Sequence, residues 1–127
     1  MPPARPRPVS AAERTAILTR ATLRAASQLG LTNKLLATVI GDSEATVSRM
    51  RSGEYTLQRG QISFELAVLF LRLYRSLDAI VGGDSTVAGS WLRNRNTVLG
   101  AEPIALIQTV PGLVNVIQYL DARRAVV

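Results

Sequence analysis

The amino-acid sequence predicts an all-α fold in which an N-terminal helix-turn-helix lobe is joined by a long helix to a small helical C-terminal lobe. Apolar residues recur at spacings of three and four over residues 10–30 and 61–83, as on the buried face of a helix. Two short helical patterns separated by a glycine lie between them, at residues 31–53. At 127 residues and 47% hydrophobic composition, the chain can form one ordinary core or two small lobes that share a helix.

The N-terminal end combines a proline-rich tail with a strong helix start. Alternating prolines in residues 1–9 block helix and sheet formation, so we expect a disordered tail there. Ser10 and Glu13 have the spacing of a capping box, and Gly30 stands where a helix ends, so a helix is expected over residues 10–30. Its apolar stripe, predicted to pack on the next two helices, consists of Leu18, Ala21, Ala25 and Leu29.

The next stretch has the pattern of two short helices joined by a tight turn. Thr32 and Ser43 are suited to cap the first and the second helix. Gly41 is placed where the first helix stops in a left-handed conformation. The predicted inward positions of the second helix are Val47 and Met50, and its outward or flanking positions are Ala45, Thr46, Ser48, Arg49 and Arg51.

The middle of the chain is predicted to be a loop followed by a long helix. Residues 54–60 lack a clean period, and we expect a loop there whose Tyr55 and Leu57 enter the core. Residues 61–83 are apolar on more than one side, so this connecting helix needs two partners: the preceding lobe on one side, and the C-terminal residues or a second subunit on the other. Its main stripe consists of Leu66, Phe70, Leu73, Leu77 and Ile80.

Residues 84–127 are predicted to form short helices with turns between them. Asp84 can cap a helix that carries Trp91, and Pro103 suits the first turn of another. The Val-Pro-Gly sequence at 110–112 is expected to break that second helix before the last one begins. We therefore expect a small apolar lobe after the connecting helix.

The composition excludes several classes of function. The chain has no cysteine and no histidine, which removes thiol nucleophiles, imidazole bases, disulfides and the common zinc sites. The nine acidic residues show no recurring close pair on one helical face, so we expect no catalytic residue, no metal site and no cofactor. No apolar run could span a bilayer, and the N-terminus lacks a signal peptide's apolar core, which predicts a cytoplasmic protein without a membrane partner.

Positive charge is concentrated in the first half of the chain. The formal net charge is +6, and residues 1–60 hold nine basic and four acidic side chains, against six and five in residues 61–127. Fourteen of the fifteen basic residues are arginine, which suits bidentate contacts to phosphate and guanine. This distribution favours a polyanionic partner for the first half, and the alternative is a solubilising surface.

The turn-containing stretch carries Leu31-Thr32, Leu36-Ala37, Gly41, Ser43, Thr46-Val47-Ser48-Arg49 and Gly53. This pattern resembles the Cro and phage-repressor type of helix-turn-helix, which implies binding to operator DNA as a homodimer, because one small recognition helix rarely binds tightly. The side chains expected to face base edges are Ala45, Thr46, Ser48 and Arg49, and those expected nearer phosphates are Asn33, Lys34, Ser43 and Arg51. Two packed helices without DNA contact are the alternative.

The last stretch carries Ala88, Trp91-Leu92, Asn96, Leu99, Gly100, Pro103, Leu106, Thr109, Gly112, Val116 and Leu120. This string resembles the C-terminal toxin-binding domain of the Xre/MbcA/ParS antitoxin family. The resemblance implies that the chain covers the NAD cleft of a RES-domain toxin, which consumes NAD or transfers ADP-ribose, and represses its own operon. It implies a helix-turn-helix domain at 10–60, a connecting helix at 61–83, a toxin-binding domain at 84–127, and a higher hetero-oligomer with the toxin.

The residues expected to contact the toxin are Trp91, Asn94, Asn96, Tyr119, Asp121, Arg123, Arg124, Val126 and Val127. The apolar tail would enter the cleft, and the charges would meet its rim. A purely structural role is the alternative for several of them. Trp91 can be buried in its own core, the asparagines are common turn residues, and the arginine pair suits a helix C-terminus.

Three classes of function therefore remain open. The first is an inhibitor of a toxic enzyme that also represses transcription, and the second is a plain homodimeric helix-turn-helix repressor without a toxin partner. An enzyme that uses carboxylates is the third. A neighbouring gene for a RES-type protein, or a tight inactive complex, would separate the first two, and NAD hydrolysis by the chain alone would support the third.

Overall fold

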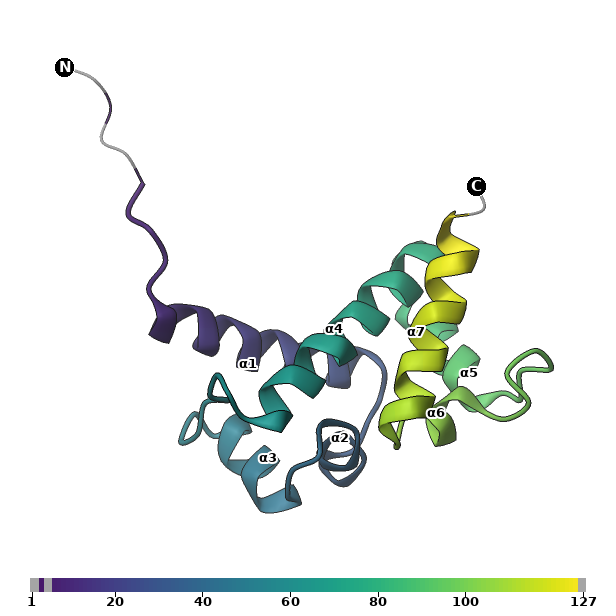
Figure 1. Ribbon diagram of the computed structural model, residues 1–127, viewed down its shortest axis with the longest axis horizontal. Coiled ribbons are helices and arrows are strands. Elements are labelled where there is room, and N and C mark those ends of the chain that lie inside the picture. The colour runs from purple at the N-terminus through teal and green to yellow at the C-terminus, as the bar shows by residue number, and fades with distance from the viewer. Residues whose placement is uncertain (1–2, 4–5, 126–127) are drawn as a thin grey trace.

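The computed structural model describes residues 3 and 6–125, and this part of the chain is all-helical apart from one isolated bridge between Asn96 and Ala101. The all-α prediction is therefore confirmed. α4 runs diagonally through the molecule, with α1, α2 and α3 on one side and α5, α6 and α7 on the other (Figure 1). The helices are α1 (Ala11–Gln28), α2 (Asn33–Ile40), α3 (Glu44–Arg51), α4 (Ile62–Ile80), α5 (Ser85–Arg93), α6 (Pro103–Leu106) and α7 (Val110–Ala125).

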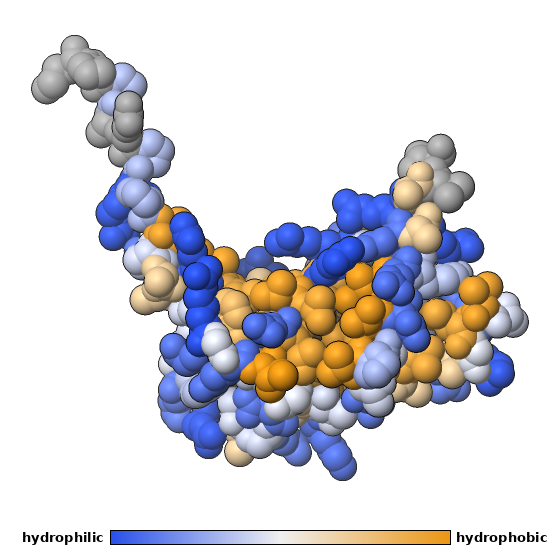
Figure 2. Space-filling view, viewed as in Figure 1, coloured by the Kyte–Doolittle hydropathy of each residue, from blue (hydrophilic) through white to orange (hydrophobic). Residues whose placement is uncertain are grey.

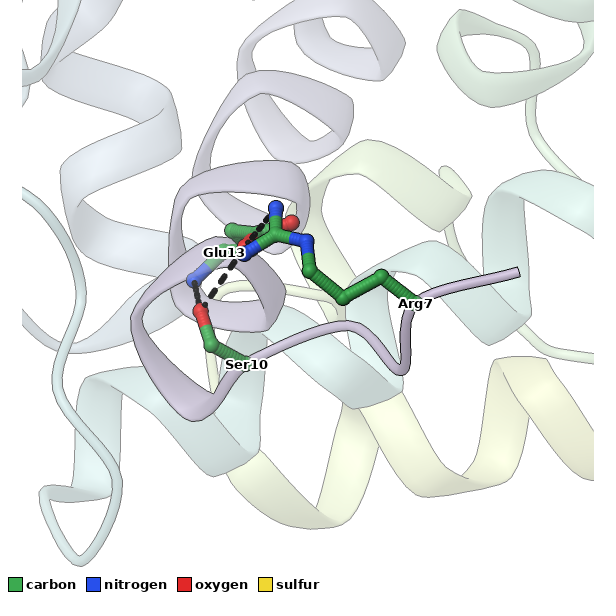
Figure 3. A network of polar contacts seen from close by, with 3 residues as sticks. All are labelled: Arg7, Ser10 and Glu13. Carbon is green, nitrogen blue, oxygen red and sulfur yellow. Dashed lines mark hydrogen bonds and ion pairs between the residues drawn. The ribbon is translucent and has the colours of Figure 1, made fainter. Parts of the chain in front are cut away.

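Side-chain caps fix where four of these helices begin. The Ser10 hydroxyl accepts a hydrogen bond from the backbone N–H of Glu13, and the Glu13 carboxylate accepts from Ser10 and from Arg7 (Figure 3). Of the predicted tail at 1–9, residues 1, 2, 4 and 5 lie outside the described part of the chain. The other predicted caps are also confirmed, and they are Thr32 for α2, Ser43 for α3 and Asp84 for α5.

The turn between α2 and α3 depends on one glycine. Gly41 has a φ of 69°, a left-handed conformation that side chains with a Cβ rarely adopt, and it ends α2 as predicted. The chain then re-enters a helix at Glu44, and Val47 and Met50 are buried as predicted. The turn therefore brings α3 against α2 and leaves the other side of α3 exposed.

α4 is the centre of the core. Four residues of its predicted stripe are buried, but Ile80 is 41% exposed, so its inclusion in the stripe was wrong. The reason is that a repeat of three and four residues drifts slowly around a helix of 3.6 residues per turn. The residues of α7 that join this core are Leu113, Val116, Ile117 and Leu120.

The buried face of α1 differs from the predicted one. Leu18 and Ala21 are only half-buried, whereas Thr15, Thr19 and Thr22 are buried. Each threonine hydroxyl donates to a backbone carbonyl one turn earlier, so the buried oxygen keeps a hydrogen-bond partner. The Thr19 hydroxyl also accepts from the backbone N–H of Leu57, which fixes the 54–60 loop to α1. Ala25 and Leu29 of the predicted stripe are buried as expected, so the rotation moves only Leu18 and Ala21 toward the surface.

The start of α7 also differs from the prediction. The Val-Pro-Gly sequence at 110–112 does not precede the last helix but forms its first turn. Proline is tolerated there because the first N–H groups of a helix have no partner within it. A Cβ at Gly112 would lie 1.9 Å from the carbonyl oxygen of Leu106, so only glycine lets α7 pass this close to α6.

Arg93 joins the two halves of the molecule. Its guanidinium donates to the carbonyl oxygens of Leu29 and Gly30, at 3.0 and 2.9 Å, where α1 ends. A third hydrogen bond goes to Gly89 within α5. Carbonyls at a helix C-terminus lack partners within the helix, so this arginine satisfies them and holds α5 against the first lobe.

Candidate functional site

The exposed side of α3 is the first candidate site. Ala45, Ser48 and Arg49, three of the four residues predicted to face base edges, are exposed there, and α3 lies at the lower edge of the molecule (Figure 1). The helix packs on α2 through the opposite side, which leaves this side open to solvent. A short exposed helix with a small residue and an arginine has the dimensions to enter a DNA major groove.

Thr46 is the exception among the predicted base-edge residues. It is only 7% exposed, so its predicted outward position was wrong. Its hydroxyl accepts from Ser43 at 2.9 Å and from the Arg49 guanidinium at 3.2 Å. Thr46 is therefore buried beneath the exposed side of α3, where its hydroxyl orients the Arg49 side chain.

The residues predicted to lie near phosphates are found at the start of α2 and at the two ends of α3. Lys34 is exposed, and Ser43 uses its hydroxyl as the cap of α3. Arg51 donates to the Asn33 side chain and, at 3.2 Å, to the Ser27 hydroxyl. Arg51 therefore ties the end of α3 to α1 and α2, and the amide oxygen of Asn33 is occupied by that contact.

A notch in the C-terminal lobe is the second candidate site. Its volume is about 390 Å³, and its lining combines α5, the loop after it and α7. Five of the residues predicted to contact a toxin meet here, although they are far apart in the sequence. The residues that line the notch are Trp91, Asn94, Arg95, Asn96, Thr97, Val98, Tyr119 and Arg123.

Two stacked aromatic rings form one wall of this notch. Trp91 and Tyr119 are half-buried, their ring centroids are 6.1 Å apart, and their ring planes make an angle of 19°. The guanidinium carbon of Arg123 lies over the Tyr119 ring, 5.6 Å from its centroid. Each contact of this kind contributes about 1 kcal/mol and limits side-chain motion. This wall of the notch is therefore preformed and combines two aromatic rings with the guanidinium group of Arg123.

The loop between α5 and α6 forms the other wall and projects from the molecule (Figure 1). The Asn96 side chain accepts hydrogen bonds from the backbone N–H groups of Val98 and Leu99, both at 3.0 Å. The Asn96 backbone pairs with Ala101 and Gly100. This holds Val98 at the tip of the loop with 74% of its surface exposed. Val98 was not among the residues predicted from the sequence, because a single valine in a loop has no periodicity.

Two predicted toxin-contact residues lie away from the notch. The Asp121 carboxylate accepts from the Ser76 hydroxyl at 2.7 Å and from Arg72, so it ties α7 to α4. Arg124 lies on the same side of α7 and lines a different groove. Val126 and Val127 are outside the described residues.

Asp121 should make stability depend on pH. The hydrogen bond from Ser76 and the nearby Arg72 lower the pKa of this carboxyl, despite its partial burial. Its stabilising contribution is therefore present above the ordinary aspartate pKa of about 4 and is lost as the pH falls through the lowered value. We expect Asp121→Asn to reduce the free energy of unfolding by about 1 kcal/mol at pH 7 and to have a smaller effect at pH 3.

Urea unfolding at the two pH values measures this difference. Glu102→Gln is the matched control, because Glu102 is exposed and makes no side-chain cap at the start of α6. A loss for Asp121→Asn that is equal at pH 7 and pH 3 would contradict the role of the charge.

Metal-ligating clusters and membrane-spanning helices are both absent from the described residues. No group of three metal-ligating side chains occurs among them. Within the same part of the chain, every helix is too short or too polar to cross a bilayer.

Comparison with known proteins gives two family matches. The antitoxin Xre-like helix-turn-helix domain matches residues 8–72, and the antitoxin Xre/MbcA/ParS C-terminal toxin-binding domain matches residues 76–125. No curated protein matches the chain. Among solved structures, a chain of the M. tuberculosis MbcT–MbcA toxin–antitoxin complex is similar, with a TM-score of 0.65 and 18% identity over 86% of this chain and 95% of that one. At this identity, the likeness shows the fold alone.

Proposed function

The chain belongs to the Xre/MbcA/ParS antitoxin family, and on that premise we propose that it inhibits a RES-domain toxin and represses the operon that encodes both proteins. The toxin would be an enzyme that consumes NAD or transfers ADP-ribose, and the C-terminal lobe would cover its active site. The α3 surface would bind the operator. In this proposal the chain itself carries out no catalysis.

The observation that carries the proposal is the notch in the C-terminal lobe. It combines two aromatic rings, an exposed valine and two arginines, and it lies within the part of the chain that matches the toxin-binding domain. Tryptophan, tyrosine and arginine are the side chains that most often dominate protein interfaces. Among the described residues, those that line the notch include two arginines and no acidic side chain, so its charge suits a partner with carboxylates.

Co-expression with the product of the neighbouring gene tests this function. We expect that product alone to stop growth and to lower cellular NAD or label proteins with ADP-ribose, and this chain to restore growth by forming a tight inactive complex. Deletion of residues 123–127 should release the toxin and leave DNA binding intact. Full inhibition by the truncated chain would exclude a contribution of the α7 end to inhibition.

A plain homodimeric repressor is the second candidate function. An exposed surface on α1 and α4 favours the formation of a homodimer. Two adjoining grooves between α1 and α4 contain Arg14, Arg72 and Arg75 and a set of apolar side chains that we call the α1/α4 face: Ile17, Leu18, Ala21, Val68 and Leu71. Figure 2 shows orange, apolar surface across the middle of the molecule. Ile17 is 49% and Val68 45% exposed. Contiguous apolar surface of this kind usually marks an interface.

We propose that a second copy of the chain covers the α1/α4 face. The face is turned to the viewer in Figure 2, whereas α3 lies at the lower edge in Figure 1. A twofold axis parallel to that face can therefore direct both α3 helices to the same side. Such a dimer would read two half-sites about one helical turn apart on the operator.

The operator proposal predicts different roles for two basic residues. We expect Arg49→Ala to weaken operator binding by about 1 to 3 kcal/mol and to relax sequence specificity, because Arg49 is exposed on α3. Lys34→Ala should weaken binding to all sequences alike and reduce the salt dependence by about one ion. Titration of operator and random duplexes at several salt concentrations measures both, and equal effects of the two variants on both duplexes would contradict this division.

A further inference from the structure

The loop at residues 94–101 has features of a rigid insertion element. Its tip is Val98, the most exposed of the large hydrophobic residues in the described chain. The loop turns on the Asn96 side chain, which accepts from two successive backbone N–H groups, and on the pairing of Asn96 with Ala101. These bonds are internal to the loop, so its shape does not depend on a partner.

The exposure of Val98 on a rigid loop lowers the stability of the free chain but favours binding to a partner. Keeping Val98 in water forgoes the stabilisation that burial of its apolar side chain would provide. Because the backbone is already fixed, a partner that buries this side chain would not need to order the loop first. The loop is therefore suited to insert into a preformed cavity of another molecule.

The charges beside Val98 define the partner's chemistry. Arg95 is exposed and lines the same notch, and Arg123 lies over the Tyr119 ring at its edge. Neither arginine belongs to the ion pairs formed within the described part of the chain. A partner that accepts Val98 would thus meet two guanidinium groups that have no carboxylate partner within the described chain, and these favour carboxylates around its cavity.

We propose that Val98 inserts into an apolar socket on the toxin, that Arg95 and Arg123 pair with acidic residues on the rim of this socket, and that Asn96 is a positioning residue. This inference rests on the proposed function, because it takes the toxin as the partner. It assigns the contact to the 94–101 loop, in which the sequence predicted only Asn94 and Asn96 as toxin-contact residues. The stacked Trp91 and Tyr119 rings support the insertion from one side.

Binding measurements with the full-length chain and the purified toxin of the neighbouring gene test this proposal. We expect Val98→Ala to raise the Kd roughly tenfold by removing two buried methyl groups, and Val98→Asp to raise it at least a hundredfold. Arg95→Glu should raise the Kd about tenfold and weaken the salt dependence of association. Val110→Asp is the matched control, because Val110 is 50% exposed at the start of α7 and lies outside the notch.

Asn96→Ala tests whether Asn96 acts by holding the loop in shape, separately from the contact that Val98 makes with the toxin. It should raise the Kd about tenfold and speed hydrogen exchange at the backbone N–H groups of Val98 and Leu99, while Val98 itself is retained. Circular dichroism confirms that each variant is folded. If Val98→Asp binds as tightly as Val110→Asp, the insertion is excluded although the antitoxin function stands. If the unchanged chain neither binds nor inhibits the toxin, the proposed function itself fails.

Discussion

Replacement of Gly112 by alanine is expected to unfold the C-terminal lobe. The new Cβ would lie 1.9 Å from the carbonyl oxygen and 2.7 Å from the carbonyl carbon of Leu106, and both atoms belong to the backbone. Relief of this clash requires α6 and α7 to separate, which removes Leu113 and Val116 from the core. We expect a loss of at least about 3 kcal/mol in the free energy of unfolding, together with loss of toxin binding.

Urea unfolding followed by tryptophan fluorescence reports on the C-terminal lobe, because Trp91 is the sole tryptophan of the chain and lies in that lobe. Gly100→Ala is the matched control, since Gly100 has a left-handed φ of 81° but no atom lies within 4 Å of the place that its Cβ would take. It should cost only about 1 to 2 kcal/mol of backbone strain. A similar loss for both variants would mean that backbone strain, and not the approach of α6 to α7, determines the effect at Gly112.

The sequence predicts the helix starts well because the signals are local. A cap such as Ser43 acts on a backbone N–H three residues away, so the pattern and the structure involve the same few residues. Gly41 similarly shows its left-handed role through its own lack of a Cβ. These features need no knowledge of how the lobes pack.

The wrong predictions concern features that depend on tertiary packing: which face of α1 is buried, and where α7 begins. The buried threonines of α1 look polar in sequence, but their hydroxyls bond to carbonyls of the same helix and become compatible with a core. The resulting rotation of α1 transfers Leu18 to the α1/α4 face. The Pro-Gly pair of α7 looks like a break because both residues disfavour helix interiors, whereas here it occupies a first turn.

The candidate notch was predicted in part. Tyr119 and Arg123 are four residues apart and share one side of α7, whereas Asp121, two residues after Tyr119, points about 200° around the helix toward α4. A list of polar residues near the C-terminus could not separate these two sides. Val98 was missed for another reason: its exposed position at the loop tip depends on hydrogen bonds to Asn96, which leave no periodic pattern in the sequence.

Val68→Glu is expected to convert the proposed dimer into a monomer and to abolish tight operator binding. Val68 is 45% exposed on the α1/α4 face, and a twofold contact through this face would bury two of the new carboxylates. The dimer dissociation constant should rise at least roughly a hundredfold. Operator affinity should fall at least as much, because a monomer binds only one half-site.

Light scattering at micromolar concentration and operator titration measure the two effects on the same protein. Val87→Glu is the matched control, because Val87 is 49% exposed on α5 and lies away from the α1/α4 face. Toxin binding by Val68→Glu should persist, since the notch lies in the other lobe. A monomeric unchanged chain, or a Val68→Glu variant that stays dimeric, would exclude this face as the contact. Operator binding that survives in a monomeric variant would instead show that one α3 helix is sufficient.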